Sequence, residues 1–245
     1  MKKAIIATLA VFLFSSHLAA ATLGHHPLWK AERLPDLYFE VLAASAKSME
    51  GLQAQDGRFR SRIPRPGESE EKTWRITGMQ YIYVPALLYT TADPFNPRRG
   101  DKKLLEMALR AGDYLASCIT PEGLIAPRVN GKETNAGDAH RTMYCWAEAL
   151  GLLKEHMEPD RLKSWRAALR RVGEQLVRDL KPRIDRPRYT SPFLGYSPNH
   201  FGLRATTIWR MGMVLDIPEW VSLTTPAIRR FVLEYQPGGY WEEHD

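Results

Sequence analysis

Three polar residues at the start of one expected helix have the types and spacing needed for acid–base chemistry on an anionic substrate. Asn199, His200 and Arg204 follow Ser197 and Pro198, a pair typical of a helix N-terminus. Asn199 and His200 fall in the first turn, where free backbone N–H groups and the helix dipole favour an anion. An amide, an imidazole and a guanidinium there could bind a carboxylate and move a proton. The alternative is that Asn199 only caps the helix and His200 is a structural histidine.

The helix that must position these residues is predicted from its apolar spacing. Five residues at helical intervals form an apolar stripe: Phe201, Ala205, Ile208, Gly212 and Leu215. His200, Arg204 and Thr207 share a different face. The preceding segment, 189–197, is rich in aromatic residues, Pro and Gly, so we expect an irregular approach to the helix.

Helical periodicity dominates the rest of the chain. We expect helices over about 34–52, 74–91 with a kink at Pro85, 101–119, 138–157, 160–180, 198–215 and 225–235. No stretch alternates as a strand does, so the predicted fold class is all-α, with about seven helices in a single domain, 22–245. Long loops alternate with short connections, as in antiparallel helical hairpins whose long loops gather at one rim. We expect the functional residues at that rim.

The long loops and the adjoining helix ends carry many aromatic and polar residues. They are Phe59, Trp74, Asn135, Asp138, His140, Arg141, Tyr189, Tyr196, Asn199, His200, Tyr240 and Trp241. Aromatic rings beside hydrogen-bonding groups suit sugars, whose C–H faces are apolar and whose edges are hydroxyls. For any single Trp or Tyr the alternative is core filling.

Residues 1–21 have the three parts of a secretory signal peptide. Lys2 and Lys3 supply the positive start, 4–14 is apolar, and 19–21 are small residues suited to cleavage. We therefore expect an exported protein, periplasmic or extracellular. The alternative, an uncleaved membrane anchor, is disfavoured because the apolar run is short for a bilayer. We expect no other membrane span.

The charge and length of the remaining chain fit one exported domain. Roughly 220 residues suffice for a sizeable core. The net charge is +6, of which Lys2 and Lys3 belong to the signal, so the mature excess is about +4. A modest basic excess suits acidic glycans. No dense Lys/Arg block indicates nucleic-acid binding.

The sequence favours neither a disulfide nor a metal site. Cys118 and Cys145 are the two cysteines, and both fall in helical patterns, which favours buried free thiols over a disulfide. Acidic residues and a histidine end the chain, but such residues at a terminus are usually solvated. We expect no metal and no cofactor.

This exported helical pattern resembles the carbohydrate-active enzymes of the (α/α) toroid type. The resemblance is carried by DGRF at 56–59, NAGDAHRTMYCW at 135–146, YSPNH at 196–200 and PGGYWEEHD at 237–245. That group includes polysaccharide lyases of the alginate-lyase and heparinase-like families, and unsaturated-uronyl hydrolases. The resemblance implies helical hairpins in a toroid. About seven helices make only a partial one, so we expect a domain truncated at its C-terminus, with self-association through its exposed apolar edge.

The resemblance implies β-elimination on the uronate of an acidic polysaccharide or oligosaccharide. Asn199 and Arg141 would neutralise the carboxylate. His200 would be the general base, since an unperturbed imidazole titrates near neutrality. Tyr196 would protonate the leaving oxygen, with Tyr189 and Tyr240 as substitutes. The substrate-binding side chains would be Trp74, Asn135, Asp138, His140, Tyr189, Arg204, Tyr240 and Trp241.

Two other readings stay open. A glycoside hydrolase, including an unsaturated-uronyl hydrolase, needs two carboxyl groups, and Asp138, Glu242 and Glu243 are available at loop or helix ends. Asp138 could equally be a helix N-cap. A non-catalytic glycan-binding fragment is the third reading, because part of an active site can bind a sugar without reacting.

Overall fold

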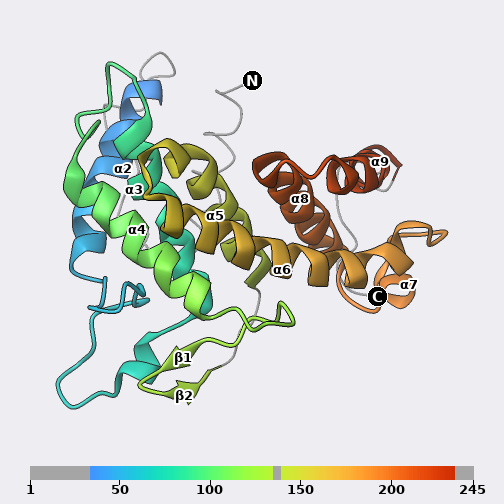
Figure 1. Ribbon diagram of the computed structural model, residues 1–245, viewed down its shortest axis with the longest axis horizontal. Coiled ribbons are helices and arrows are strands. Elements are labelled where there is room, and N and C mark those ends of the chain that lie inside the picture. The colour runs from blue at the N-terminus through green and yellow to red at the C-terminus, as the bar shows by residue number, and fades with distance from the viewer. Residues whose placement is uncertain (1–33, 135–138, 235–245) are drawn as a thin grey trace, which may run out of the picture.

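The computed structural model describes residues 34–134 and 139–234 (Figure 1). Within them the chain forms eight α-helices: α2 (Leu34–Glu50), α3 (Tyr83–Thr90), α4 (Lys102–Ser117), α5 (Ala139–Leu153), α6 (Pro159–Ile184), α7 (Ser191–Leu194), α8 (Pro198–Leu215) and α9 (Pro218–Glu234). Short 3-10 helices are η2 (Glu70–Thr73), η3 (Ile76–Ile82) and η4 (Lys154–His156). One hairpin pairs β1 (Arg128–Val129) with β2 (Lys132–Glu133). The all-α prediction is confirmed. The expected signal peptide lies outside the described residues.

Several helix boundaries follow the expected signals. Asp101 caps α4, its carboxylate accepting a hydrogen bond from the Lys103 backbone N–H at 2.9 Å. Pro198 is the first residue of α8, as predicted, but the Ser197 side chain forms no capping hydrogen bond. All five residues of the predicted stripe on α8 are buried.

Two boundaries differ from expectation. The helix expected over 74–91 begins as the 3-10 helix η3 and becomes α-helical only at Tyr83, so Pro85 lies in the first turn of α3 and not in the middle of one continuous α-helix. A proline in a first turn removes no intrahelical hydrogen bond, which explains why it is tolerated there. The last helix begins at Pro218 rather than near 225 and continues past the internal Pro226.

Three helices, α3, α5 and α8, form an inner layer in which neighbours run parallel. At the start of α5, Thr142 donates a hydrogen bond to the Ile76 carbonyl at the start of η3. At the other end, the ring of Tyr89 in the last turn of α3 lies 5.0 Å from the ring of His156, which follows α5. Helix α8 packs on the other side of α5 in the same direction. The start of η3, which leads into α3, and the N-terminal ends of α5 and α8 therefore lie at one end of the layer.

Two further contacts fix the direction of α8 against α5. At the start of α5, the His140 carbonyl accepts a hydrogen bond from the Thr207 hydroxyl of α8 at 3.1 Å. A little further along, Arg210 donates to the buried Glu148 carboxylate at 2.8 Å. This ion pair joins the two inner helices where both are largely buried.

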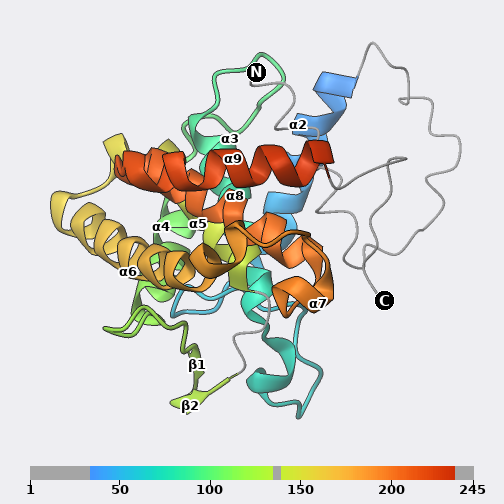
Figure 2. The ribbon, with the colours of Figure 1, turned by 90° about the vertical axis from the view of Figure 1, so that its right-hand side faces the viewer.

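Helices α4 and α6 form a second layer that covers the first (Figure 1). Asp113 on α4 accepts hydrogen bonds from Arg161 and from the Trp165 indole on α6. The adjacent Gly112 packs directly on the Trp165 ring, so no side chain fits there. Helix α9 packs on α8, and Figure 2, turned by 90° from Figure 1, shows α9 in front of α8. Successive long helices thus alternate between the two layers.

The long loops after α2 and α4 repeat the same turn, 66 positions apart (57 and 123). In the first, the Gly57 N–H donates to the Ala54 carbonyl; in the second, the Gly123 N–H donates to the Thr120 carbonyl, both at 3.0 Å. Single β-bridges close both turns: Gln53 pairs with Phe59, and Ile119 with Ile125. The turn sequences are Asp56-Gly57 and Glu122-Gly123, and both glycines have a positive φ. The chain thus repeats an outer helix, a long loop with this turn, and an inner helix.

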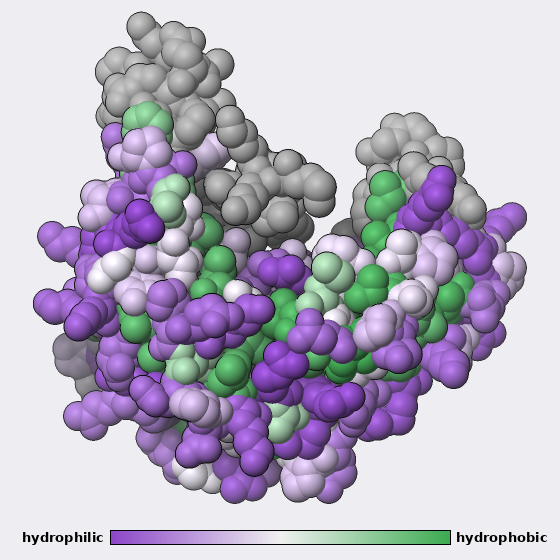
Figure 3. Space-filling view, turned by 45° about the horizontal axis from the view of Figure 1, so that its top comes forward, coloured by the Kyte–Doolittle hydropathy of each residue, from purple (hydrophilic) through white to green (hydrophobic). Residues whose placement is uncertain are grey.

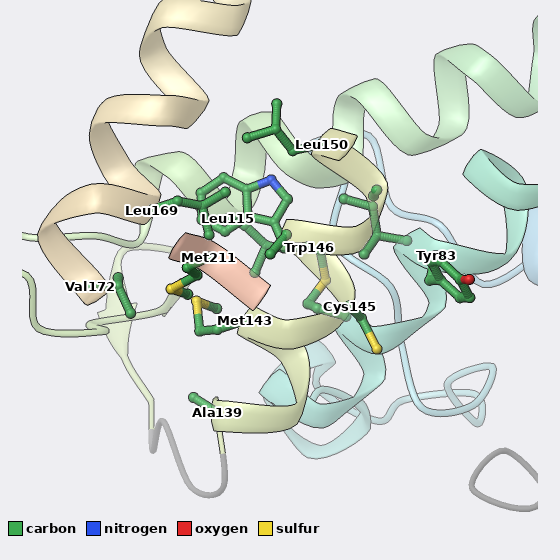
Figure 4. Close-up of a cluster of buried hydrophobic side chains, with 14 of the residues drawn as sticks. Tyr83, Leu115, Ala139, Met143, Cys145, Trp146, Leu150, Leu169, Val172 and Met211 are labelled. Atoms are coloured by element: carbon green, nitrogen blue, oxygen red, sulfur yellow. The ribbon is translucent and has the colours of Figure 1, made fainter. Parts of the chain in front are cut away.

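The main core lies between the two layers and is centred on Trp146 of α5 (Figure 4). Trp146 is fully buried, and its ring meets that of Trp165 edge-on at 5.8 Å. Met143 and Met211 fill the space between α5 and α8 (Figure 4). Burial of this apolar surface, about 25 cal/mol per Å², is the force that holds the layers together.

One face of the described surface is hollowed between the side that carries α2 and the side that carries α8 and α9 (Figure 3). Hydrophobic side chains show in and around this hollow, while the outer flanks are mostly hydrophilic (Figure 3). Among the residues described, no helix combines the length and apolar character that a bilayer crossing demands.

Candidate functional site

The predicted catalytic histidine lies where α5 and α8 begin, beside the C-terminal half of α6. Its ring is 6.4 Å from the ring of His140, centroid to centroid. His140 starts α5 and His200 lies in the first turn of α8, so the parallel packing of the two helices brings the rings together. Both residues are half-buried. The structure thus joins His140 and His200, which are 60 positions apart in the sequence.

Arg204 is the centre of this cluster. Its Nε donates to His140 Nε2 at 3.0 Å. One terminal nitrogen, Nη1, pairs with the carboxylate of Asp179 on α6. The guanidinium also lies over the ring of Tyr196, 4.1 Å from its centroid. This arginine is therefore shared among an imidazole, a carboxylate and a phenol ring.

The Arg204 contact determines the tautomer of His140. Because His140 Nε2 accepts a hydrogen bond, the neutral imidazole carries its proton on Nδ1. The Thr207 hydroxyl, donating to the His140 carbonyl, holds the backbone at the same place. The neutral His140 ring can therefore donate a hydrogen bond through Nδ1. Its Nε2 cannot act as a base while it accepts the hydrogen bond from Arg204.

Tyr196 lies in the loop between α7 and α8 beneath two arginines. The guanidinium carbon of Arg183 is 5.0 Å from the centre of its ring, in addition to the closer Arg204. Burial raises the pKa of the Tyr196 phenol, and the two positive charges only partly oppose this effect. The phenol therefore keeps its proton at neutral pH.

Asp179 and Arg183 belong to the cluster and were not predicted from the sequence. They lie one turn apart on α6, with Arg183 Nη1 at 3.0 Å from Asp179 Oδ1. Arg183 Nε also donates to the Leu194 carbonyl of α7 at 2.8 Å. The available signal was the i,i+4 spacing of Asp179 and Arg183 on an Arg-rich helix, a pattern that more often marks a solvated helix face.

The remaining predicted catalytic residues lie next to these in the chain. Asn199 precedes His200 in the first turn of α8, and Arg141 follows His140 on α5. Both are half-buried. The contacts of the cluster itself include two arginines, Arg183 and Arg204, against one aspartate, a balance that favours an anionic ligand.

Two predicted substrate-binding aromatics are core residues instead. Trp74 is only 4% exposed, and its ring packs edge-on against Tyr114 at 6.3 Å. Tyr189 is 2% exposed and packs against Phe201 at 4.2 Å, while its hydroxyl donates to the Ile184 carbonyl. Both rings are covered, so neither offers a face to a sugar. Core filling is the reason in each case.

Other predicted residues lie outside the described part of the chain: Asn135, Asp138, Tyr240, Trp241, Glu242 and Glu243. Within the described part, no group of His, Cys, Asp and Glu side chains is arranged to hold a metal ion.

Both cysteines are free and buried, which confirms the preference for thiols over a disulfide. Burial raises the pKa of Cys118 to about 11 and that of Cys145 to about 12. Neither thiol is therefore a nucleophile at neutral pH, and the chemistry of the site rests on the histidines, Tyr196 and the arginines.

The family models, curated proteins and solved structures compared with this chain include no match to it.

Proposed function

We propose that the chain is an exported polysaccharide lyase that cleaves an acidic, uronate-containing glycan by β-elimination. One observation carries the proposal: His140, Tyr196, His200 and Arg204 meet at the shared N-terminal end of two parallel inner helices. A protonated phenol, an imidazole and positive charge are the groups that this reaction uses.

The scaffold in this proposal is a partial (α/α) toroid. Parallel inner helices, a covering layer, and alternating long and short connections are the features of such a toroid, and the repeated turn at Gly57 and Gly123 supports it. The hollow that Figure 3 shows on one face, between the side with α2 and the side with α8 and α9, is consistent with such a scaffold. In this arrangement the long loops and the inner-helix N-termini share one rim.

In the proposed reaction, His200 removes the proton at C5 of the uronate, which is the difficult step. Asn199 and Arg141 neutralise the carboxylate and so stabilise the enolate-like transition state. Tyr196 gives its proton to the departing glycosidic oxygen as the C4–O bond breaks and a C4=C5 double bond forms. The raised pKa of Tyr196 supports this role, because an acid must still carry its proton when the oxygen leaves.

Exposed basic residues near the cluster support an acidic substrate. Lys181, Arg186 and Arg188 are exposed in the last turn of α6 and the loop that follows it, next to Arg183. Arg230 of α9 joins them, donating to the Pro187 carbonyl at 3.0 Å. A polyuronate could extend over these charges from the proposed reaction centre.

The test is incubation with a panel of polyuronates while ultraviolet absorbance is followed. β-Elimination produces a conjugated unsaturated uronate, so absorbance rises. Changing His200→Ala should abolish the rise while the helical circular dichroism signal is kept. His156→Ala is the matched control, because His156 is exposed at the opposite end of the inner helices.

The same assay separates the alternatives. An unsaturated-uronyl hydrolase lowers the absorbance of lyase products, and a hydrolase of saturated glycans creates reducing ends without an absorbance change. A binding fragment would retain acidic glycans in a gel and change neither signal.

A further inference from the structure

Asp179 divides its carboxylate between two arginines that come from different elements. Oδ1 lies 3.0 Å from Arg183 Nη1, one turn away on α6, and Oδ2 pairs with Arg204 Nη1 on α8. The Asp179 side chain is 32% exposed, so solvent reaches it without separating the pairs. With both oxygens used, this acid is held in one orientation.

The guanidinium of Arg204 likewise contacts several partners at once. Its Nε reaches His140, its Nη1 reaches Asp179, and its flat face covers Tyr196 at 4.1 Å. A guanidinium is planar with donors in a fixed fork, so one side-chain conformation must satisfy all three contacts. Of the three partners, Asp179 is the one with a charge opposite to that of Arg204. Its interaction is therefore the strongest of the three and contributes most to fixing the conformation of the Arg204 side chain.

We infer that Asp179 is a positioning residue: it holds Arg204 between His140 and Tyr196 and keeps that arginine from pairing with the substrate carboxylate. The inference rests on the proposed function for its catalytic consequence. An arginine without this partner would turn toward a uronate, because carboxylates bind guanidinium in a bidentate fork. The substrate carboxylate is instead left to Asn199 and Arg141.

The decisive experiment is a titration of Tyr196 in the Asp179→Asn variant, which keeps the size of the side chain. Phenolate absorbance is measured against pH, and the signal of Tyr196 is isolated by subtracting the matching Tyr196→Phe protein in each background, because the chain has 10 tyrosines. If Asp179 positions Arg204, the arginine leaves the ring of Tyr196. The loss of the arginine raises the pKa of Tyr196 more than the loss of the Asp179 charge lowers it, because Arg204 has the larger effect on the phenol, so the pKa rises by about 1 unit.

The opposite sign would overturn the inference. If Arg204 stays in place without Asp179, the only change is the loss of a negative charge near the phenol, and the pKa of Tyr196 falls. An unchanged pKa would overturn it equally. Asp185→Asn is the matched control, since it removes the same charge from the exposed end of α6 and should leave Tyr196 unaffected.

A second variant guards against misfolding of Asp179→Asn, which circular dichroism would reveal. Arg204→Lys keeps the charge but lacks the fork, so one ammonium cannot reach His140 and Asp179 while covering the ring. The pKa of Tyr196 should rise here too, and a fall or no change would contradict the inference.

Kinetics give a second readout if the protein is a lyase. Asp179→Asn should lower kcat roughly 10- to 100-fold without raising KM, because the released Arg204 binds the uronate in an unproductive position. A higher KM with unchanged kcat would refute the positioning role. The titration needs no substrate, so a chain that leaves polyuronates intact would refute the proposed function and still test this inference.

Discussion

Substitution of Gly123 tests whether the turn in the loop after α4 packs against the covering helix α6. The φ of Gly123 is +85°, and a Cβ added there would lie 2.2 Å from the Arg171 carbonyl oxygen of α6. The left-handed conformation costs an alanine about 1 kcal/mol or slightly more. The clash is with main chain, which cannot swing aside, so overpacking adds about 2 kcal/mol. We expect Gly123→Ala to lower the free energy of unfolding by about 3 kcal/mol.

The matched control is Gly131→Ala. Gly131 has nearly the same backbone, with φ +78°, but no atom lies within 4 Å of the added Cβ. It should therefore cost only about 1 kcal/mol. Gly57→Ala repeats the test in the first long loop, because its Cβ would lie 2.1 Å from the Arg110 carbonyl oxygen of α4.

Urea unfolding followed by circular dichroism measures all three variants. The difference of about 2 kcal/mol between Gly123→Ala and Gly131→Ala corresponds to about 4–8 °C in Tm for a chain of this size. If the two variants lie within about 0.5 kcal/mol of one another, the long loop does not pack on α6 as described, and the repeated unit of outer helix, turn and inner helix fails with it.

Three further outcomes are expected. Burial raises the pKa of Cys118 to about 11 and that of Cys145 to about 12. Neither thiol should therefore react with iodoacetamide at about pH 8 in the folded protein, while both should react in urea. Rapid labelling of the native chain would show that the thiols are exposed. The raised pKa of both thiols also means that stability is lost as pH rises above about 9, where the unfolded thiols ionise, and Cys145→Ala should flatten that loss in urea titrations at several pH values. Replacing both Arg186 and Arg188 by Gln should weaken polyuronate binding several-fold at low salt and little at high salt. The control is Arg99→Gln, which changes an exposed arginine at the opposite end of the inner helices and should leave binding unchanged. Equal effects of the two changes in a gel-retardation assay would show that the loop with Arg186 and Arg188 does not contact the glycan.

The local features of α8 could be predicted from sequence because they depend on nearest neighbours. Pro198 marks the first turn, and the spacing from Phe201 to Leu215 defines the buried face, so the first-turn positions of Asn199 and His200 follow directly. The neighbouring Tyr196 is placed by the same short stretch. Each of these inferences spans fewer than about 20 residues, within which helical geometry alone fixes relative positions.

The rest of the cluster depends on contacts across the fold. Asp179 reaches Arg204 from a different helix, and His140 meets His200 only because α5 and α8 pack in parallel. A sequence pattern carries no such information. Likewise nothing local distinguishes a buried Trp74 from an exposed one, since its burial depends on Tyr114, 40 positions away.

The repeat of outer helix, long loop and inner helix determines which elements form the candidate site. One hairpin, α4 with α5, contributes His140, whereas the next, α6 with α8, contributes Asp179, Tyr196, His200 and Arg204. The cluster therefore exists only at the seam between two successive units, and neither hairpin holds the full set alone. A change in the angle between these two units would change both the distance between the two imidazoles and the hydrogen bond from Arg204 to His140.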